Sequence, residues 1–180
     1  MVEQLVERIR QKDQRAMSQF YQMYIEELSS VCYRYVPSRN DAKDVLQNSF
    51  VKIFTSISTI DYRGEEALWR WMKRIVVNEA LCFLRERKRL LFVNQDEALM
   101  EKTDDEEPKA EQMTADELHL LIRELPDGYR TVVNLFVFEN YSHKQIAEIL
   151  DITESTSATQ LYYAKRLLAR KIKAFMNERR

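Results

Sequence analysis

Polar and aromatic side chains between residues 155 and 166 have the spacing of one helix face that could contact a nucleic acid. Leu161, Ala164 and Leu168, with Ser157 on the same line, would form the buried stripe of this helix. The opposite face then carries Ser155, Thr159, Tyr162, Tyr163 and Arg166. Hydroxyls, flat rings and a cation suit base edges, thymine methyl groups and phosphates. The pattern therefore predicts a surface that recognises a nucleic acid.

The helix that carries this face follows another helix after only a short break. Hydrophobic periodicity runs from Ile146 to Leu150, stops at residues 151–153 and resumes at Leu161. Thr153 is a natural N-cap for the second helix. Two helices joined by so tight a turn are typical of a helix-turn-helix, whose second helix can lie in a major groove. An ordinary helical hairpin with a polar exposed face would give the same pattern.

Catalytic chemistry has no comparable support in the sequence. Cys32 and Cys82 are far apart and lack metal-ligand spacing, and His119 and His143 are equally isolated. No constellation of a nucleophile, a metal site or a phosphate-binding loop is present. We therefore expect no enzyme activity, no metal, no cofactor and no small-molecule substrate.

The composition predicts an all-α protein. Among 180 residues there are only two Gly and three Pro, too few for the turns that sheets require, while 45% of residues are hydrophobic. The charged start resembles no secretory signal, and no apolar run is long enough to span a bilayer. These features predict a cytoplasmic protein.

The charge distribution divides the chain into two parts. Residues 94–117 hold ten acidic and two basic residues, a balance of −8, so the remainder of the chain carries +7. This segment also contains Pro108 and lacks apolar periodicity, as expected of an extended linker. We predict a first domain at 1–90, an acidic flexible linker at 91–113 and a second domain at 114–180.

Three helices are expected in the first domain. One helix buries an apolar stripe before Pro37: Phe20, Tyr21, Tyr24, Leu28, Val31, Cys32 and Tyr35. A second helix buries Ala42, Val45, Leu46, Ser49, Phe50, Ile53 and Ile57, and turns Asp44, Gln47 and Asn48 outward. A loop over 58–67 leads to a long central helix over 68–89.

Capping signals organise the second domain. Thr114 with Glu117, and Ser142 with Gln145, have the spacing of capping boxes. The first box opens a helix that ends at the turn beginning with Pro126, and another helix over 129–139 follows this turn. The second box opens the helix-turn-helix.

These segments together resemble the extracytoplasmic-function (ECF) sigma factors of the sigma-70 superfamily. DAKDVLQNSF at 41–50 and WMKRIVVNEALCFLRERKR at 71–89 match the sigma-2 domain. Spaced residues from Leu125 to Leu168 match sigma-4, among them those in LPDGYR at 125–130 and IAEIL at 146–150. The resemblance implies a sigma-2-like helical bundle, a sigma-4-like helix-turn-helix and an acidic linker between them. It implies an alternative sigma factor that directs core RNA polymerase to promoters and helps to open them. A membrane-linked anti-sigma factor is a further partner of the family.

The resemblance also assigns roles to residues of the first domain. Asp44, Gln47 and Asn48 match positions that contact the clamp coiled coil of the polymerase, although a merely solvated polar face would look the same. The −10 element would be held by a loop and the long helix: Tyr62, Arg63, Gly64, Trp71, Arg74 and Asn78. Trp71 could equally be a core aromatic. Phosphates would meet Arg85, Arg87, Lys88 and Arg89. Cys82 departs from the Asp or Asn common at its position.

In the second domain, positions facing the −35 element correspond to Ala158, Thr159, Tyr162 and Tyr163, with Ser155, Lys165 and Arg166 nearby. Many relatives carry Arg where this chain has Ala158 and Tyr163, so bidentate guanine readout is missing and affinity must depend on Lys165, Arg166 and the polymerase. The resemblance implies that the flap of the polymerase is a second contact of the protein, besides the clamp coiled coil. Ser157 replaces the usual Val and is expected to loosen the packing of the two helices.

Three questions stay open at the level of sequence. The acidic linker could thread through the polymerase channel that later holds RNA, or serve as a soluble spacer. A stand-alone regulator that binds an operator as a dimer is the main alternative function, and it requires symmetric half-sites. A helical adaptor with a basic tail, binding an acidic protein, is a more distant one.

Overall fold

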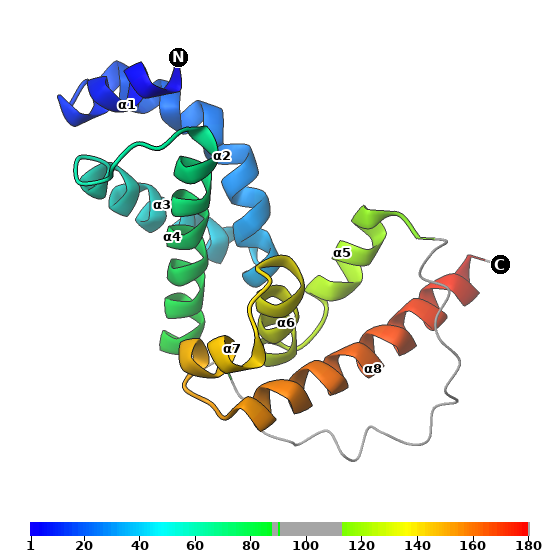
Figure 1. Cartoon of the computed structure of the whole chain (residues 1–180). Coiled ribbons are helices and arrows are strands. Elements are labelled where there is room, and N and C mark those ends of the chain that lie inside the picture. Colours follow the sequence, from blue (N-terminus) through cyan, green and yellow to red (C-terminus); the bar gives the residue numbers. More distant parts are fainter. Residues whose placement is uncertain (88–89, 91–112, 180) are drawn as a thin grey trace. The chain divides into compact units, whose positions relative to one another are not determined.

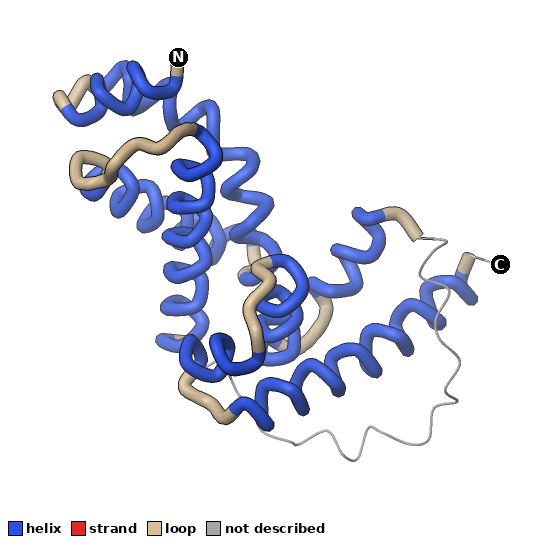
Figure 2. The backbone as a smooth tube through the Cα atoms, in the orientation of Figure 1, coloured by secondary structure: helices blue, strands red, loops and turns tan. Residues whose placement is uncertain are grey.

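The computed structural model describes residues 1–87, 90 and 113–179. Every regular element within these ranges is a helix, and Figure 2 shows the helices joined by loops, which confirms the predicted all-α class. The chain divides into two compact units, Met1–Arg87 and Lys88–Arg180 (Figure 1). None of the described helices is both long enough and apolar enough to cross a bilayer. The linker predicted at 91–113 lies outside the described residues, except for Met113.

Local sequence signals set the helix boundaries of the first unit. Its described helices are α1 Val2–Arg10, α2 Gln14–Tyr35, α3 Arg39–Ser56 and α4 Glu65–Glu86. The Asp13 carboxylate caps α2 by accepting from the backbone N–H groups of Arg15 and Ala16 at 2.9 and 3.2 Å. The Ser38 hydroxyl caps α3 in the same manner. Gly64 precedes α4 with a φ of +99°, which glycine adopts without strain.

The core of the first unit forms where α4 packs against both α2 and α3. Every residue of the stripe predicted for α3 is buried. The stripe predicted for α2 is correct except at its edge, since Tyr21 is 43% exposed although its ring lies 4.6 Å from that of Phe50, and Tyr24 is half-buried. The hydrophobic periodicity therefore located the core, but it overestimated the width of the buried stripe by the two tyrosines at its edge.

One helix and one helix start differ from the sequence-based expectation. The structure adds α1, which buries Val2, Leu5, Val6 and Ile9 although the segment is highly charged. Helix α4 begins at Glu65, three residues before the predicted start at 68. Glu65 and Glu66 occupy its first turn, where acidic side chains favour the positive end of the helix dipole.

The second unit is built from shorter helices and one long one. Its described helices are α5 Ala115–Arg123, α6 Asp127–Val133, the π-helix η3 Asn134–Phe138, α7 His143–Leu150 and α8 Glu154–Glu178. Both predicted capping boxes are confirmed: Thr114 with Glu117 at the start of α5 and Ser142 with Gln145 at the start of α7. Helix α8 packs against α5, α6 and α7.

The segment predicted as one helix after the Pro126 turn changes its winding midway. The Glu139 N–H donates to the Asn134 carbonyl five residues earlier at 3.0 Å, which is the π pattern. Leu135 in this segment is completely buried, while Val137 is 55% exposed. One wider turn rotates the following side chains, and such a rotation cannot be read from hydrophobic periodicity.

Candidate polymerase and nucleic-acid interfaces

Helix α3 presents the first predicted set of site residues. Asp44, Gln47 and Asn48 are all exposed, on the side of α3 opposite its buried stripe. Val51 lies one turn further along the same face and is 57% exposed. This face therefore combines a carboxylate, two amides and an apolar side chain. The sequence analysis did not indicate Val51, because one β-branched residue on a polar face resembles a core residue.

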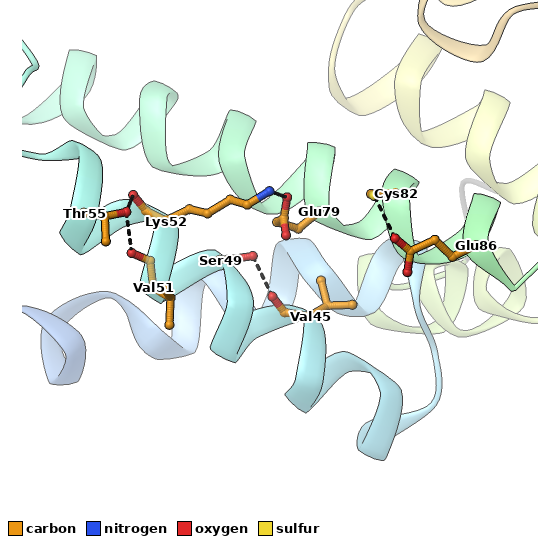
Figure 3. A network of polar contacts seen from close by, with 8 residues as sticks. All are labelled: Val45, Ser49, Val51, Lys52, Thr55, Glu79, Cys82 and Glu86. Atoms are coloured by element: carbon orange, nitrogen blue, oxygen red, sulfur yellow. Dashed lines mark hydrogen bonds and ion pairs between the residues drawn. The ribbon is translucent and has the colours of Figure 1, made fainter.

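Polar contacts lie on α3 and α4 next to this face, and one of them, between Lys52 and Glu79, joins the two helices (Figure 3). The Lys52 ammonium pairs with the Glu79 carboxylate across the two helices at 2.5 Å, and the pKa of Lys52 is raised chiefly by this hydrogen bond. The buried Ser49 hydroxyl donates to the Val45 carbonyl at 2.7 Å within α3. Of these two bonds, the Lys52–Glu79 pair crosses between α3 and α4, beside the contact in which the two helices pack together.

The outward face of α4 carries the second set. Trp71, Arg74 and Asn78 lie on the side of α4 opposite its buried residues, with Arg74 and Asn78 exposed. Trp71 is half-buried, so its ring both packs and reaches solvent. Cys82 follows on the same face one turn after Asn78. Desolvation and the hydrogen bond from its thiol to Glu86 raise the pKa of Cys82, so the thiol stays neutral at pH 7.

The loop before α4 carries Tyr62, Arg63 and Gly64, of which Arg63 is the most exposed. The Arg63 guanidinium pairs with the Asp61 carboxylate at 2.9 Å. At the start of the loop, the Arg10 guanidinium from α1 donates to the Ile60 carbonyl at 2.7 Å. Helix α1 thus anchors the loop, a role that the sequence did not reveal because fifty residues separate the two groups. Lys88 and Arg89 lie outside the described residues.

The turn between α7 and α8 has the geometry of a helix-turn-helix. Asp151 adopts the left-handed conformation, with φ 55° and ψ 51°, and its N–H bonds to the Ala147 carbonyl. Thr153 then caps α8 by accepting from the Thr156 N–H at 3.0 Å. A single left-handed residue followed by a cap reverses the chain within three residues. The predicted break and its N-cap are confirmed.

A hydrogen bond joins α7 and α8 near this turn. The buried Ser157 hydroxyl lies 2.9 Å from Nδ1 of His143, and the His143 ring stacks on Phe136 at 4.8 Å. Ser157 was expected to loosen the packing of the two helices, whereas the structure shows a polar contact that ties them together. The physical reason is that the buried hydroxyl lies within hydrogen-bonding distance of a ring nitrogen, which satisfies it.

We predict that Ser157→Ala lowers the free energy of unfolding of the second unit by about 1 kcal/mol, because it leaves the His143 nitrogen without this partner. Urea denaturation followed by circular dichroism measures the change. Ser155→Ala is the matched control, since Ser155 is exposed on the same helix. Equal stability of the two variants would show that the bond contributes nothing.

The outward face of α8 carries the third set. Ser155, Tyr162 and Lys165 are exposed, and Thr159, Tyr163 and Arg166 are half-buried. The Tyr162 and Tyr163 rings meet at 5.4 Å, edge to face. The Arg166 guanidinium donates to the Tyr162 hydroxyl at 3.0 Å and lies 5.6 Å from the centre of that ring. These contacts preorganise two rings and a cation on one side of the helix.

The described ranges show no comparable arrangement of side chains for metal binding or thiol chemistry. No three His, Cys, Asp or Glu side chains there lie close enough to hold a metal ion. Cys32 is completely buried, and burial raises the pKa of its thiol to about 12. The surfaces of α3, α4 and α8 are therefore the sites whose side chains best match a function.

Two family descriptions match the chain. The family described as Sigma-70 region 2 matches residues 20–90, and Sigma-70, region 4 matches residues 115–168. The ECF RNA polymerase sigma-E factor of Haemophilus influenzae is 31% identical over 185 residues, covering 96% of this chain and 95% of that protein. The RNA polymerase sigma-H factor of Pseudomonas aeruginosa is 26% identical over 187 residues, covering 98% and 96%.

A solved structure shares the fold. It is the sigma factor RpoE of Bartonella quintana in complex with the anti-sigma factor NepR. The TM-score is 0.50 with 17% sequence identity, and the match covers 87% of this chain and 96% of that one.

Proposed function

The chain belongs to the ECF RNA polymerase sigma factors of the sigma-70 family, and from this membership we propose how its three exposed faces divide the work of promoter recognition. It is an alternative sigma factor that directs transcription initiation. One observation supports this assignment: α3, α4 and α8 each expose their predicted site residues on the side opposite a buried stripe. We assign residues 1–90 to polymerase and −10 binding, and 114–180 to −35 binding, in the cytoplasm where polymerase acts.

The α3 face binds core RNA polymerase. Asp44, Gln47 and Asn48 contact the clamp coiled coil, and Val51 supplies an apolar anchor beside them. Polar side chains around one apolar contact are typical of a protein interface, where the polar groups set orientation and the apolar contact adds affinity. Helix α3 packs against α4 and pairs with it through Lys52 and Glu79, so the polymerase-binding face and the DNA-facing helix belong to one packed unit.

The loop and α4 bind the −10 element. A base extracted from the duplex enters the loop of Tyr62, Arg63 and Gly64, and the downstream strand follows Trp71, Arg74 and Asn78. Extraction costs a few kcal/mol of stacking and pairing, which the rings and cations must offset. The neutral thiol of Cys82 lies along the same path and can make only weak hydrogen bonds.

Helix α8 reads the −35 element. Ser155, Thr159, Tyr162 and Tyr163 face the bases, while Lys165 and Arg166 face phosphates. Because Ala158 and Tyr163 stand where Arg is common, guanine readout by a bidentate Arg gives way to hydroxyl contacts, contacts with thymine methyl groups and DNA shape.

An anti-sigma factor is the proposed regulator. The structure of the Bartonella quintana sigma factor contains its anti-sigma factor. In the family this partner is commonly linked to the membrane. The stand-alone dimeric regulator is not favoured, because the matched family regions include region 2 as well as region 4.

We predict that an Asp44→Ala, Gln47→Ala variant weakens binding to core polymerase at least about tenfold, which corresponds to about 1.4 kcal/mol. A pull-down of purified core polymerase measures the loss. The matched control is Gln22→Ala with Glu26→Ala, which removes an amide and a carboxylate from exposed positions of α2. Failure of the folded wild-type protein to bind core polymerase would contradict the proposed function itself.

A further inference from the structure

We propose that Arg10 of α1 holds the capture loop, residues 57–64, in the conformation that receives the extracted −10 base. Arg10 acts through the backbone of this loop and not by contact with a base, so it is a positioning residue. The inference rests on the −10 function proposed for Tyr62, Arg63 and Gly64.

The middle of the capture loop has little support of its own. Its first residue, Ile57, is completely buried in the core of the first unit, and its last residue directly precedes α4. Between these ends, the Thr59 hydroxyl donates to the Ser56 carbonyl at 2.8 Å, at the end of α3. The Arg63–Asp61 pair lies within the loop, and its side chains are 77% and 76% exposed, so it stabilises the loop little. These local contacts do not tie the middle of the loop to another helix.

Arg10 supplies such a tie from α1, which lies beside the loop (Figure 1). One terminal nitrogen of its guanidinium donates to the Ile60 carbonyl at 2.7 Å, and the other donates to the Glu7 carboxylate of its own helix at 3.1 Å. The Nε atom of Arg10 is covered from solvent, so the group lies against the protein and not in water. A hydrogen bond from a cation is stronger than a neutral one. Because this bond ends on a backbone oxygen, it fixes the path of the chain at Ile60.

Helix α1 is itself fixed to the first unit. It packs against α2, and its buried residues are Val2, Leu5, Val6 and Ile9. The Arg8 guanidinium also pairs with the Asp13 carboxylate at 2.7 Å, and Asp13 caps α2. The bond from Arg10 therefore connects the capture loop to α2 through α1.

Tyr62 shows a second approach of α1 to the loop. Tyr62 is half-buried, and desolvation raises the pKa of its hydroxyl. The carboxylates of Glu65 in α4 and Glu3 in α1 raise this pKa further, which places both near the ring. The hydroxyl therefore stays protonated at physiological pH and can donate a hydrogen bond to a base. Helix α1 thus borders the part of the loop that is proposed to meet the base.

A preformed loop lowers the cost of base capture. Extraction already costs the stacking and pairing energy of the base. A loop that had to become ordered at the same moment would add the entropy of fixing its backbone. With Ile60 held by Arg10, this ordering is complete before the DNA arrives, so more of the contact energy of the loop appears as affinity for the base. The effect of Arg10 must therefore depend on whether a base is present to be captured.

The test is a double-mutant cycle between Arg10 and the base in the reconstituted holoenzyme. The probe is the single non-template strand of the −10 region of a promoter that the wild-type holoenzyme selects from a random-sequence pool. Copies of this strand carry an abasic site at each −10 position in turn, and the position at which the wild type loses most affinity marks the captured base. Dissociation constants are then measured with the intact strand and with this abasic copy.

The variants are Arg10→Met, Arg10→Lys and the control Arg15→Met. Arg15 is an exposed cation of α2, so the control removes the same charge from the neighbouring helix. A pull-down of core polymerase verifies that each variant keeps its first unit folded.

We expect Arg10→Met to bind the intact strand about tenfold more weakly than the wild type, as the loss of one charge-assisted hydrogen bond predicts. Its affinity for the abasic copy should equal that of the wild type, because no base is left to capture. Arg10→Lys should lie between, since lysine cannot reach Ile60 and Glu7 with one planar fork. Arg15→Met should bind both strands as the wild type does.

Three results would overturn the inference. Equal losses of affinity for the intact and the abasic strand would indicate a general structural or electrostatic effect. Wild-type affinity of Arg10→Met for both strands would show that the bond to Ile60 does not support capture. A slope of log affinity against log salt that is lower by about 0.7 in this variant would show that Arg10 contacts a phosphate directly.

Two further outcomes are distinguishable. If Arg10→Met fails to bind core polymerase, the cycle is judged on Arg10→Lys, and wild-type values in that variant would overturn the inference. If the wild-type holoenzyme shows no position at which an abasic site weakens binding, the loop captures no base and its proposed −10 function is wrong. If such a position exists and only the variants behave as the wild type does, the inference alone is wrong.

Discussion

Replacing Tyr162 and Tyr163 by alanine is expected to abolish transcription from a selected promoter while leaving polymerase binding intact. The two rings meet edge to face, Tyr162 is 54% exposed, and its hydroxyl accepts a hydrogen bond from Arg166. Losing two base contacts of about 1.5 kcal/mol each reduces promoter occupancy about a hundredfold. Run-off transcription with reconstituted holoenzyme measures the loss, and a pull-down of core polymerase verifies binding.

Phenylalanine variants separate the rings from the hydroxyls. Tyr162→Phe with Tyr163→Phe keeps both rings and removes the hydrogen bond to Arg166, so we expect it to retain most transcription if ring contacts dominate. Wild-type transcription by the double alanine variant would exclude the rings as −35 contacts. Loss of polymerase binding in that variant would instead indicate that the second unit has been disturbed.

The second large effect concerns Arg130, which is only 3% exposed. Its guanidinium donates to the Leu125 carbonyl at 2.6 Å and to the Arg123 carbonyl at 3.3 Å, and it also pairs with the Asp127 carboxylate. These carbonyls belong to the end of α5 and the turn that follows, where intrahelical partners run out. Arg130 therefore joins α5 to α6 by serving several acceptors at once.

Arg130→Ala should lower the free energy of unfolding of the second unit by about 3 kcal/mol, because it leaves buried acceptors and a carboxylate unpaired. The free energy of unfolding of Arg130→Lys should lie between those of the wild type and Arg130→Ala, since lysine keeps the charge but cannot reproduce the planar, forked set of donors of arginine. Lys144→Ala is the control, because Lys144 is an exposed cation of α7.

The tryptophans make this measurement selective. Both of them, Trp69 and Trp71, lie in α4, so their fluorescence follows the first unit while circular dichroism follows both. The Arg130 variants should shift only the transition that fluorescence does not report. A shift of the fluorescence transition, or no shift by dichroism, would refute the local role of Arg130.

Much of the fold followed from local sequence. The capping boxes, the stripe of α3 and the break before Thr153 were all predicted, because caps and hydrophobic periodicity act over one or two turns of helix. The exposed polar faces followed for the same reason, since burial of one side of a helix determines which side remains outside. Their assigned roles stay predictions that the experiments above address.

The remaining features depended on contacts between distant residues. The Arg10 guanidinium meets the Ile60 carbonyl, Lys52 meets Glu79, and Arg179 meets Glu117 sixty-two residues away. The packing of the helices determines which polar side chains come within hydrogen-bonding distance. Because the chain contains many Arg, Lys, Asp and Glu residues, the sequence does not show which of them pair. The sequence by itself therefore determined the helices, their caps and the faces they expose. Tertiary packing decided that Ser157 ties α7 to α8, that Arg130 joins α5 to α6, and that Lys171 and Arg179 of α8 pair with acidic residues of α5.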